Sequence, residues 1–225
     1  MKRILLIEDD PDIGELITYH LHKSAFEPHH VTNANDALIL LERMTFDALL
    51  LDLMLPGLKG LDFLTILRGQ ERFAALPIII ISALNAESEI IAGINKGADD
   101  YLPKPFSMEM LVTKLNALLR RSSGETGERS VFEYGSIKID NNIRKVFVNG
   151  KEVTLTHREY ELLKLFVTHP HKIYPREVLL NSLWGYSSDF LTRTIDAHVS
   201  TLRKKLGAAG SIIKSVPKTG YGIDD

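Results

Sequence analysis

Four carboxylates follow two apolar runs in the first half of the chain. Glu8, Asp9 and Asp10 come directly after the run at residues 3–7, and Asp52 comes after the run at residues 48–51. An isolated buried carboxylate is costly unless a partner compensates its charge. If the two runs are neighbouring parallel strands, the acids meet at one edge of a sheet, and their repulsion is relieved only by a cation. Oxygen ligands select a hard ion, so the sequence predicts a Mg²⁺ site.

A hydroxyl and an ammonium group follow two further runs. Ser82 ends the run that starts at residue 77, and Lys104 follows the weaker segment 100–102. A carboxylate nucleophile, a divalent cation, a hydroxyl and an ammonium suit the acceptance of a phosphoryl group, because the cations neutralise charge while the carboxylate attacks. Each residue alone also fits a plainer role as a strand end, helix cap, turn residue or solvated cation. All of these residues come directly after successive predicted strands, which favours their joint role in accepting a phosphoryl group.

The elements that would position these groups alternate between apolar runs and amphipathic segments. Runs that are apolar at every position are typical of strands buried on both faces of a parallel sheet. These are residues 3–7, 48–51 and 77–81, with weaker strands near 29–31 and 100–102. Helical patterns lie between them, at 11–23, 33–43, 58–69, 87–96 and 107–121. The pattern predicts a doubly wound α/β domain of five β/α units, whose ligands lie at the carboxyl ends of the strands.

A polar segment rich in Gly and Ser divides the chain. It predicts a flexible linker at 122–130, between one domain at 1–121 and another at 131–225. Short alternating segments follow, with a tight hairpin turn at Asn149-Gly150. Three helical patterns and a closing hairpin complete the chain, and the first of these helices begins at the capping box 156–159. This order predicts an α+β winged helix-turn-helix domain.

Composition restricts the class of protein. The chain has 225 residues, no cysteine and a formal net charge of −2. Residues 1 to 121 contain 12 Lys/Arg and 17 Asp/Glu, a net of −5, and residues 122 to 225 contain 15 and 12, a net of +3. The two halves therefore suit different partners. No apolar run approaches the roughly 20 residues of a membrane span. The N-terminal apolar run is too short for a signal peptide. The absence of cysteine fits a cytoplasmic protein.

Several stretches resemble a known family. "ILLIEDD", "LLLDLMLPGLKG", "IIIISA" and "GADDYLPKPF" are similar to the receiver domain of two-component response regulators. "LTHREYELLKLF", "LWGY", "TRTIDAHVSTLRKKL" and "SVPKTGYG" resemble the winged-helix effector domain of the OmpR/PhoB subfamily. The resemblance implies a transcription factor, not an enzyme. A histidine kinase would phosphorylate it, and the phosphorylated form would pair as a homodimer on promoter DNA.

The resemblance assigns roles to the residues of the acidic edge. Asp52 would accept the phosphoryl group, and the Mg²⁺ ligands would be Asp9, Glu8 through water, Asp52 and the Met54 carbonyl. Lys104 would pair with the phosphoryl group and Ser82 would hydrogen-bond it, while Tyr101 would turn inward as Ser82 moves. The Lys104-Pro105 bond is expected to be cis, and Met54 and Leu84 are expected to influence the lifetime of the phosphorylated state.

The resemblance also implies a dimer face made of helix 4, strand 5 and helix 5. Charges on this face are Asp99, Asp100, Lys114, Arg120 and Arg121. At two positions where the family usually has a basic residue and an acid, this chain has Ile90 and Met110. Either a hydrophobic contact replaces one salt bridge, or the two residues are only exposed or at the edge of the core.

The helix at 192–206 is the candidate for DNA recognition. It has basic and polar residues opposite an apolar face, which also describes an ordinary amphipathic helix. Its place between a shorter helix and a hairpin favours insertion into the major groove, with the hairpin as a wing. By resemblance the DNA-binding residues are Arg193, Thr194, His198, Thr201, Arg203, Lys218 and Thr219. The loop before this helix corresponds to one that can touch RNA polymerase, although we expect Trp184 to be a packing residue.

Two alternatives remain open at this point. A phosphatase of the haloacid dehalogenase type also uses an Asp nucleophile and Mg²⁺, but it has a second acid where this chain has Met54. A receiver that no longer accepts phosphate would bind DNA constitutively, which the complete set of pocket residues disfavours. His29 and His30 have no metal-ligand spacing, so we expect them to be surface residues.

Overall fold

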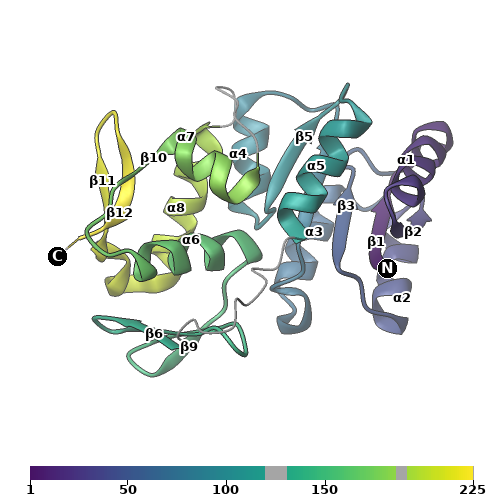
Figure 1. Cartoon of the computed structure of the whole chain (residues 1–225). Coiled ribbons are helices and arrows are strands. Elements are labelled where there is room, and N and C mark those ends of the chain that lie inside the picture. Colours follow the sequence, from purple (N-terminus) through teal and green to yellow (C-terminus); the bar gives the residue numbers. More distant parts are fainter. Residues whose placement is uncertain (120–130, 186–191, 225) are drawn as a thin grey trace. The chain divides into compact units, whose positions relative to one another are not determined.

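The computed structural model describes residues 1–119, 131–185 and 192–224, without the side chains of residues 192 and 193. The chain divides into two compact units, Met1–Leu119 and Arg120–Asp225, whose ribbons are shown in Figure 1. The linker predicted at 122–130 lies outside the described residues. No described helix is long and apolar enough to span a membrane.

A parallel sheet of five strands forms the centre of the first unit, in the order β2-β1-β3-β4-β5 (Figure 1). Its strands are β1 (Lys2–Ile7), β2 (Phe26–Val31), β3 (Ala48–Leu51), β4 (Ile78–Ser82) and β5 (Asp100–Pro103). β1 pairs in parallel with β2 on one side and with β3 on the other. The strand order therefore reverses at β1 and β3, which is the place where a doubly wound sheet opens a crevice for ligands.

Helices cover both faces of this sheet, as predicted. They are α1 (Pro11–Lys23), α2 (Ala34–Arg43), α3 (Gly60–Arg68), α4 (Glu87–Asn95) and α5 (Met108–Leu119), with a short 3₁₀ turn η1 (Glu71–Phe73). Residues of α1 and α5, such as Ile17 and Leu115, form one buried cluster with Ile4, Leu50 and Ile79 of the strands. On the opposite face, Gly93 of α4 lies directly against Ile80 and Tyr101. Runs that are apolar at every position are explained by this coverage from two sides.

Strand β2 is longer than the sequence predicted. It begins at Phe26, before the predicted 29–31, and it includes Pro28. In the described structure β2 forms the edge of the sheet and pairs with β1. An edge strand tolerates proline and polar side chains, so the polar composition of this segment hid its extent.

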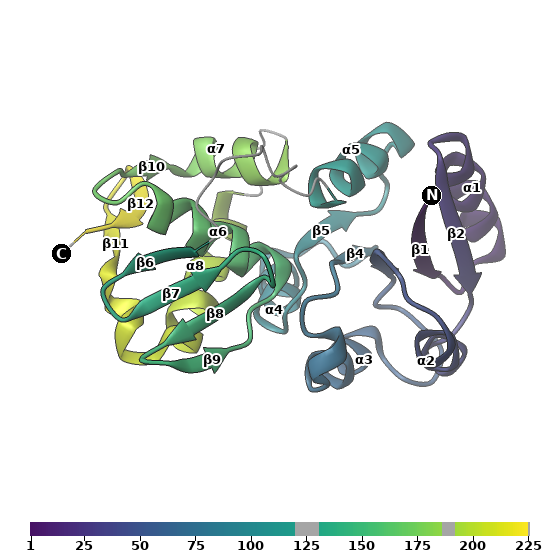
Figure 2. The ribbon, with the colours of Figure 1, turned by 60° about the horizontal axis from the view of Figure 1, so that its bottom comes forward.

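The second unit contains two antiparallel sheets around a set of helices (Figure 2). The first sheet has β6 (Val131–Tyr134), β7 (Ile137–Asp140), β8 (Lys145–Val148) and β9 (Lys151–Val153). The second has the order β10-β12-β11, with β10 (Tyr174–Pro175), β11 (Ile213–Val216) and β12 (Gly220–Ile223). The helices are α6 (His157–Thr168), α7 (Arg176–Leu179) continued by the π-helical turn η2 (Leu180–Trp184), α8 (Thr192–Leu206) and the 3₁₀ segment η4 (Gly207–Ile212).

Local signals in this unit are confirmed. Asn149 and Gly150 have φ angles of 50° and 77°, the positive pair that a tight hairpin turn requires. Thr156 and Glu159 form the predicted capping box, in which the Thr156 N–H donates to Glu159 Oε2 at 2.8 Å. Trp184 is fully buried in the core of the unit, so the expectation that it packs is confirmed.

Candidate functional site

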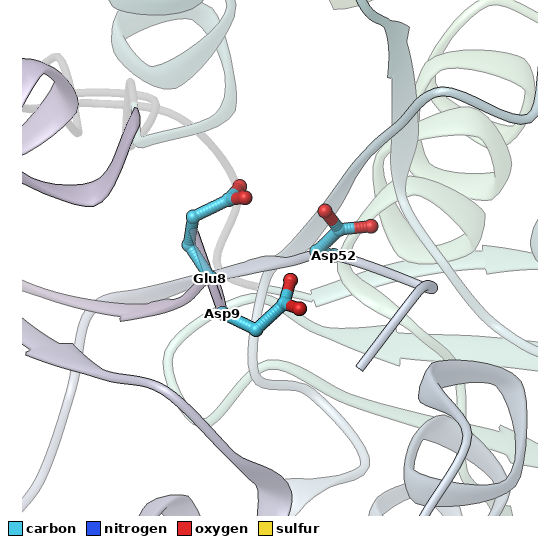
Figure 3. A group of neighbouring side chains, drawn as sticks. All are labelled: Glu8, Asp9 and Asp52. Atoms are coloured by element: carbon cyan, nitrogen blue, oxygen red, sulfur yellow. The ribbon is translucent and has the colours of Figure 1, made fainter. Parts of the chain in front are cut away.

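Three carboxylates converge at the reversal point of the parallel sheet. Glu8 and Asp9 follow β1, Asp52 follows β3, and one oxygen of each lies within 4.8 Å of the others. Figure 3 shows the three side chains pointing toward a common space. Glu8 and Asp52 are buried, whereas Asp9 is exposed at the rim. Asp10 is not in this cluster, because its carboxylate caps α1 by accepting hydrogen bonds from the N–H groups of Asp12 and Ile13.

Lys104 compensates part of this charge. Its Nζ lies 2.6 Å from Asp52 Oδ2 and 2.8 Å from each carboxylate oxygen of Glu8. Burial raises the pKa of Glu8 and is only partly opposed by the hydrogen bond from Lys104. Burial lowers the pKa of Lys104, but the hydrogen bonds to Asp52 and Glu8 outweigh it, so the lysine pKa is raised overall. One lysine against three carboxylates leaves a negative, all-oxygen site, which fits a hard divalent cation.

The Asp52 carboxylate is held by its own chain as well. The Met54 N–H donates to Asp52 Oδ1 at 2.9 Å, so the turn after β3 fixes one carboxylate oxygen while Lys104 binds the other. The Met54 side chain is 56% exposed beside the site. A phosphatase of the haloacid dehalogenase type has a second acid at this position, whereas this chain has an exposed apolar side chain. The Lys104-Pro105 bond is cis, which confirms the expectation from resemblance.

Ser82, Leu84 and Tyr101 form a connected group next to this pocket. Ser82 ends β4 and is buried, and its Oγ accepts the Leu84 N–H at 3.3 Å. The Tyr101 hydroxyl donates to the Leu84 carbonyl at 2.5 Å. Tyr101 is fully buried, and burial raises its pKa to about 12. The inward orientation that resemblance assigns to the activated form is thus the orientation in this structure.

Three of the charged residues predicted for the dimer face, Asp99, Asp100 and Lys114, form hydrogen bonds and ion pairs within the first unit. Asp99 is buried, and its Oδ2 accepts hydrogen bonds from the Ile78 N–H at 2.9 Å and from Arg68 at 3.1 Å. Lys114 Nζ lies 3.0 Å from both carboxylate oxygens of Asp100.

The two apolar residues of that face differ in exposure. Ile90 is 7% exposed and Met110 is 41% exposed. Met110 is therefore the apolar side chain that α5 offers to solvent, while Ile90 belongs to the core. Arg120 and Arg121 lie outside the described residues.

Two predicted DNA contacts on α8 face the interior. Thr194 and His198 are buried, and the His198 ring lies 5.1 Å from the Trp184 ring. This differs from the expectation that these side chains face DNA. Thr201 is half-buried, with its hydroxyl bonded to the Ala197 and His198 carbonyls. The Arg193 side chain lies outside the described residues.

Further basic residues of α8 hold the unit together. Arg203 donates two hydrogen bonds to the Ile213 carbonyl at 3.1 and 2.6 Å, so it joins α8 to strand β11. Lys205 pairs with Glu159 of α6 at 2.7 Å. Lys204 is exposed on α8, and Lys218 and Thr219 occupy the turn between β11 and β12, where Lys218 has a φ of 60°.

A polar network between α7, α8 and the wing was not predicted. Asp196 Oδ1 accepts hydrogen bonds from Arg176 at 2.8 Å and from the Tyr221 hydroxyl at 2.7 Å. Arg176 also donates to the Tyr221 oxygen at 3.1 Å. The sequence did contain a signal for this network. Asp196 is the single acid in the basic helix α8, and such a residue is expected to have a cationic partner.

His30 also differs from its prediction as a surface residue. It is half-buried, and its Nε2 lies 2.8 Å from the Glu8 carbonyl oxygen, next to the acidic cluster. The sequence signal was a glycine, Gly14, in the middle of the first predicted helix.

Comparisons with known proteins agree with this description. Residues 4–116 match the family model "Response regulator receiver domain", and residues 150–223 match "Transcriptional regulatory protein, C terminal". The chain is 36% identical to the transcriptional regulatory protein SrrA of Staphylococcus aureus over 228 residues, which cover 99% of this chain and 93% of SrrA.

Several solved structures match over the full length of both chains. A mutant form of the protein RitR has a TM-score of 0.78 at 28% identity. DrrB of Thermotoga maritima, described as an OmpR/PhoB homologue, has a TM-score of 0.52 at 24% identity, which supports the fold alone. The first family model describes the receiver domain of response regulators, and the second describes the C-terminal part of transcriptional regulatory proteins. The chain therefore belongs to the OmpR/PhoB family of two-component response regulators, DNA-binding transcription factors with a receiver domain and a winged-helix domain.

Proposed function

We propose that Asp52 accepts a phosphoryl group from a histidine kinase, and that the phosphorylated chain binds promoter DNA as a dimer. The observation that carries this proposal is the shared contact of Lys104 with Asp52 and Glu8, at 2.6 and 2.8 Å, inside the three-carboxylate cluster. A lysine in contact with the nucleophile is placed to follow the charge that moves onto the phosphoryl group.

The transfer step uses the side chains of the pocket in separate roles. An Asp52 carboxylate oxygen forms the new bond to phosphorus, while the bond from phosphorus to the kinase histidine nitrogen breaks and the nitrogen keeps the electron pair. Glu8, Asp9, Asp52 and the Met54 carbonyl are the proposed Mg²⁺ ligands. Bound Mg²⁺ supplies charge neutralisation to the phosphoryl oxygens. Lys104 stabilises the phosphoryl oxygens after transfer, because its Nζ already lies against Asp52.

Ser82 and Tyr101 are the proposed relay to the dimer face. The Ser82 hydroxyl lies at the end of β4, and the Leu84 backbone contacts both Ser82 and Tyr101. A hydrogen bond from Ser82 to the phosphoryl group would therefore pull on the segment that holds the Tyr101 hydroxyl. This couples Asp52 to the face formed by α4, β5 and α5, through which we propose that two copies pair.

DNA binding is proposed for α8 and for the turn between β11 and β12. Arg193, Thr201 and Lys204 of α8 would contact the major groove or its phosphates, and Lys218 and Thr219 the adjacent backbone. Arg203 acts indirectly, because it holds β11 through the Ile213 carbonyl. We further propose RNA polymerase as a partner, and the cytoplasm as the compartment in which the protein acts.

The test is phosphorylation with Mg²⁺ and acetyl phosphate, followed on the protein and in DNA binding together. Wild type should form a phosphoprotein and bind DNA more tightly, and Asp52→Asn should do neither. Asp10→Asn is the matched control, because Asp10 caps α1 outside the carboxylate cluster and Asn preserves the cap. DNA binding that is equally tight without phosphorylation would contradict the proposal and support a constitutive DNA-binding protein.

A further inference from the structure

Gly14 of α1 and His30 of β2 form a fitted pair beside the acidic cluster. A Cβ atom added at Gly14 would overlap the His30 ring at Cε1 and Nε2. Gly14 lies inside a helix and needs no positive φ, and glycine is among the weakest helix formers. The presence of glycine at position 14 is therefore explained by the space that it leaves for the His30 imidazole.

The His30 ring uses this space to reach the backbone of the site. Its Nε2 lies 2.8 Å from the Glu8 carbonyl oxygen. A carbonyl can only accept, so Nε2 is the protonated nitrogen of this hydrogen bond. Glu8 is the first residue after β1, and its N–H still binds the Val31 carbonyl of β2 at 3.1 Å. β2 thus holds the Glu8 backbone from both sides, by its own main chain and by the His30 side chain.

We propose that His30 is a positioning residue of the phosphorylation site, and that Gly14 provides the space it needs. This inference rests on the proposed Mg²⁺-dependent phosphorylation of Asp52. The peptide group between Glu8 and Asp9 is planar, so the direction of the Glu8 carbonyl sets the position of the Asp9 N and Cα atoms. By fixing that carbonyl, His30 holds the exposed Asp9 carboxylate at the spacing from Glu8 and Asp52 that a divalent cation requires.

The neighbouring histidine provides a matched control. His29 lies on the same strand but its ring packs against Phe46, with a centroid distance of 5.4 Å, and its Nε2 lies 3.3 Å from Glu27. His29 carries the same imidazole side chain but does not contact Glu8. If any histidine on β2 supported Mg²⁺ binding, replacing either one would weaken it equally. If the contact with Glu8 is what matters, only replacement of His30 should weaken it.

The experiment is calorimetric titration of the full, unphosphorylated chain with MgCl₂, together with the thermal midpoint of each variant. His30→Leu should raise the Kd for Mg²⁺ by about tenfold, the range seen when a group that orients a metal ligand is removed. His30→Gln, which keeps an N–H donor at a similar reach, should recover most of this loss, and His29→Leu should leave the Kd unchanged. Phosphorylation by acetyl phosphate should be slow in His30→Leu at low Mg²⁺ and normal at saturating Mg²⁺.

Gly14→Ala supplies an independent measurement. In the wild-type background it should weaken Mg²⁺ binding, because the new methyl group displaces the ring. In a His30→Ala background it should cause no further loss, so the two changes should be strongly non-additive. Mg²⁺ binding by His30→Leu that equals wild type, or an equal loss in His29→Leu, would overturn the positioning role while leaving phosphorylation of Asp52 intact. Failure of the wild type itself to bind Mg²⁺ would instead overturn the proposed function and this inference with it.

Discussion

Lys104 Nζ lies 2.6 Å from Asp52 Oδ2, although the two residues are 52 positions apart in the chain. The same ammonium lies 2.8 Å from both oxygens of Glu8. One cation therefore serves two buried acids, and Asp9 adds a third negative charge at the rim. Two negative charges therefore remain without a cationic partner in this cluster, and a divalent cation would balance them.

Removal of the lysine should make folding depend on the metal. Lys104→Met leaves Glu8 and Asp52 buried without a cationic partner, so the free energy of unfolding should fall by about 3 kcal/mol in the absence of divalent cations. Saturating Mg²⁺ should restore much of this loss, because it binds only the folded state. Thermal and urea unfolding with and without Mg²⁺ measure both effects.

The control for this change is Lys96→Met, since Lys96 is an exposed lysine bonded to the Thr65 hydroxyl. It should alter stability by no more than about 0.5 kcal/mol. Equal stability of Lys104→Met and wild type in metal-free buffer would show that the carboxylates are compensated in another way.

The central strands of the first unit are buried on both faces, so their continuous apolar runs allowed them to be predicted from the sequence. Strand β2 lies at the edge of the sheet and contains polar residues, so its full length was not predicted. The acids at the ends of β1 and β3 were predicted to meet, because parallel strands share one carboxyl edge. The contact of Lys104 with Glu8 was not predicted, since it joins residues 96 positions apart and has no local pattern. Side-chain bonds to backbone carbonyls, as in His30 and Arg203, join residues that are also separated in the chain, and neither bond was predicted.

Alkaline pH should reveal the burial of Tyr101. Its pKa is raised to about 12 by burial, so the neutral phenol contributes stability that is complete below pH 10, the ordinary tyrosine value. That contribution should be lost as the pH rises from 10 through about 12. Wild type should therefore lose stability over this interval more steeply than Tyr101→Phe, as measured by urea unfolding at each pH. Tyr19→Phe, which removes a phenol that is 61% exposed, should follow the wild-type curve.

The network around Asp196 should stabilise the DNA-binding surface. Tyr221→Phe removes the hydrogen bond to Asp196 at 2.7 Å and the one from Arg176 at 3.1 Å. The free energy of unfolding of the second unit should fall by about 1–2 kcal/mol, because a partly buried charged group loses a partner. DNA affinity should fall with it, while the Kd for Mg²⁺ stays unchanged. Tyr174→Phe, which removes a tyrosine hydroxyl from the same sheet, is the control. An equal loss of stability and DNA affinity in Tyr174→Phe would contradict a specific role of the Asp196 network.

Salt dependence should separate DNA contacts from structural lysines. Lys204 is exposed on α8 and Lys218 is in the wing turn, whereas Lys205 pairs with Glu159. Alanine at Lys204 or Lys218 should reduce the slope of log K against log salt by about 1, the effect of one lost phosphate contact. Lys205→Ala should reduce stability but leave the slope nearly unchanged. Affinity measured on one DNA fragment at several salt concentrations decides between these outcomes, and an equal slope for all three variants would contradict the assignment.

The apolar character of Met110 should make the proposed dimer insensitive to salt. Met110 is 41% exposed on α5, while Lys114 and Asp100 bind each other within one chain. Hydrophobic contacts are not screened by ions, so the dimerisation constant of the phosphorylated chain should change little between low and high salt. Met110→Glu should weaken dimerisation by about tenfold, or ~1.4 kcal/mol, and should make it salt-dependent.

Ile66→Glu is the matched control, because Ile66 is similarly exposed on α3, outside this face. Sedimentation of the phosphorylated variants provides the measurement. A steep loss of the wild-type dimer at high salt would show that charges hold the two copies together.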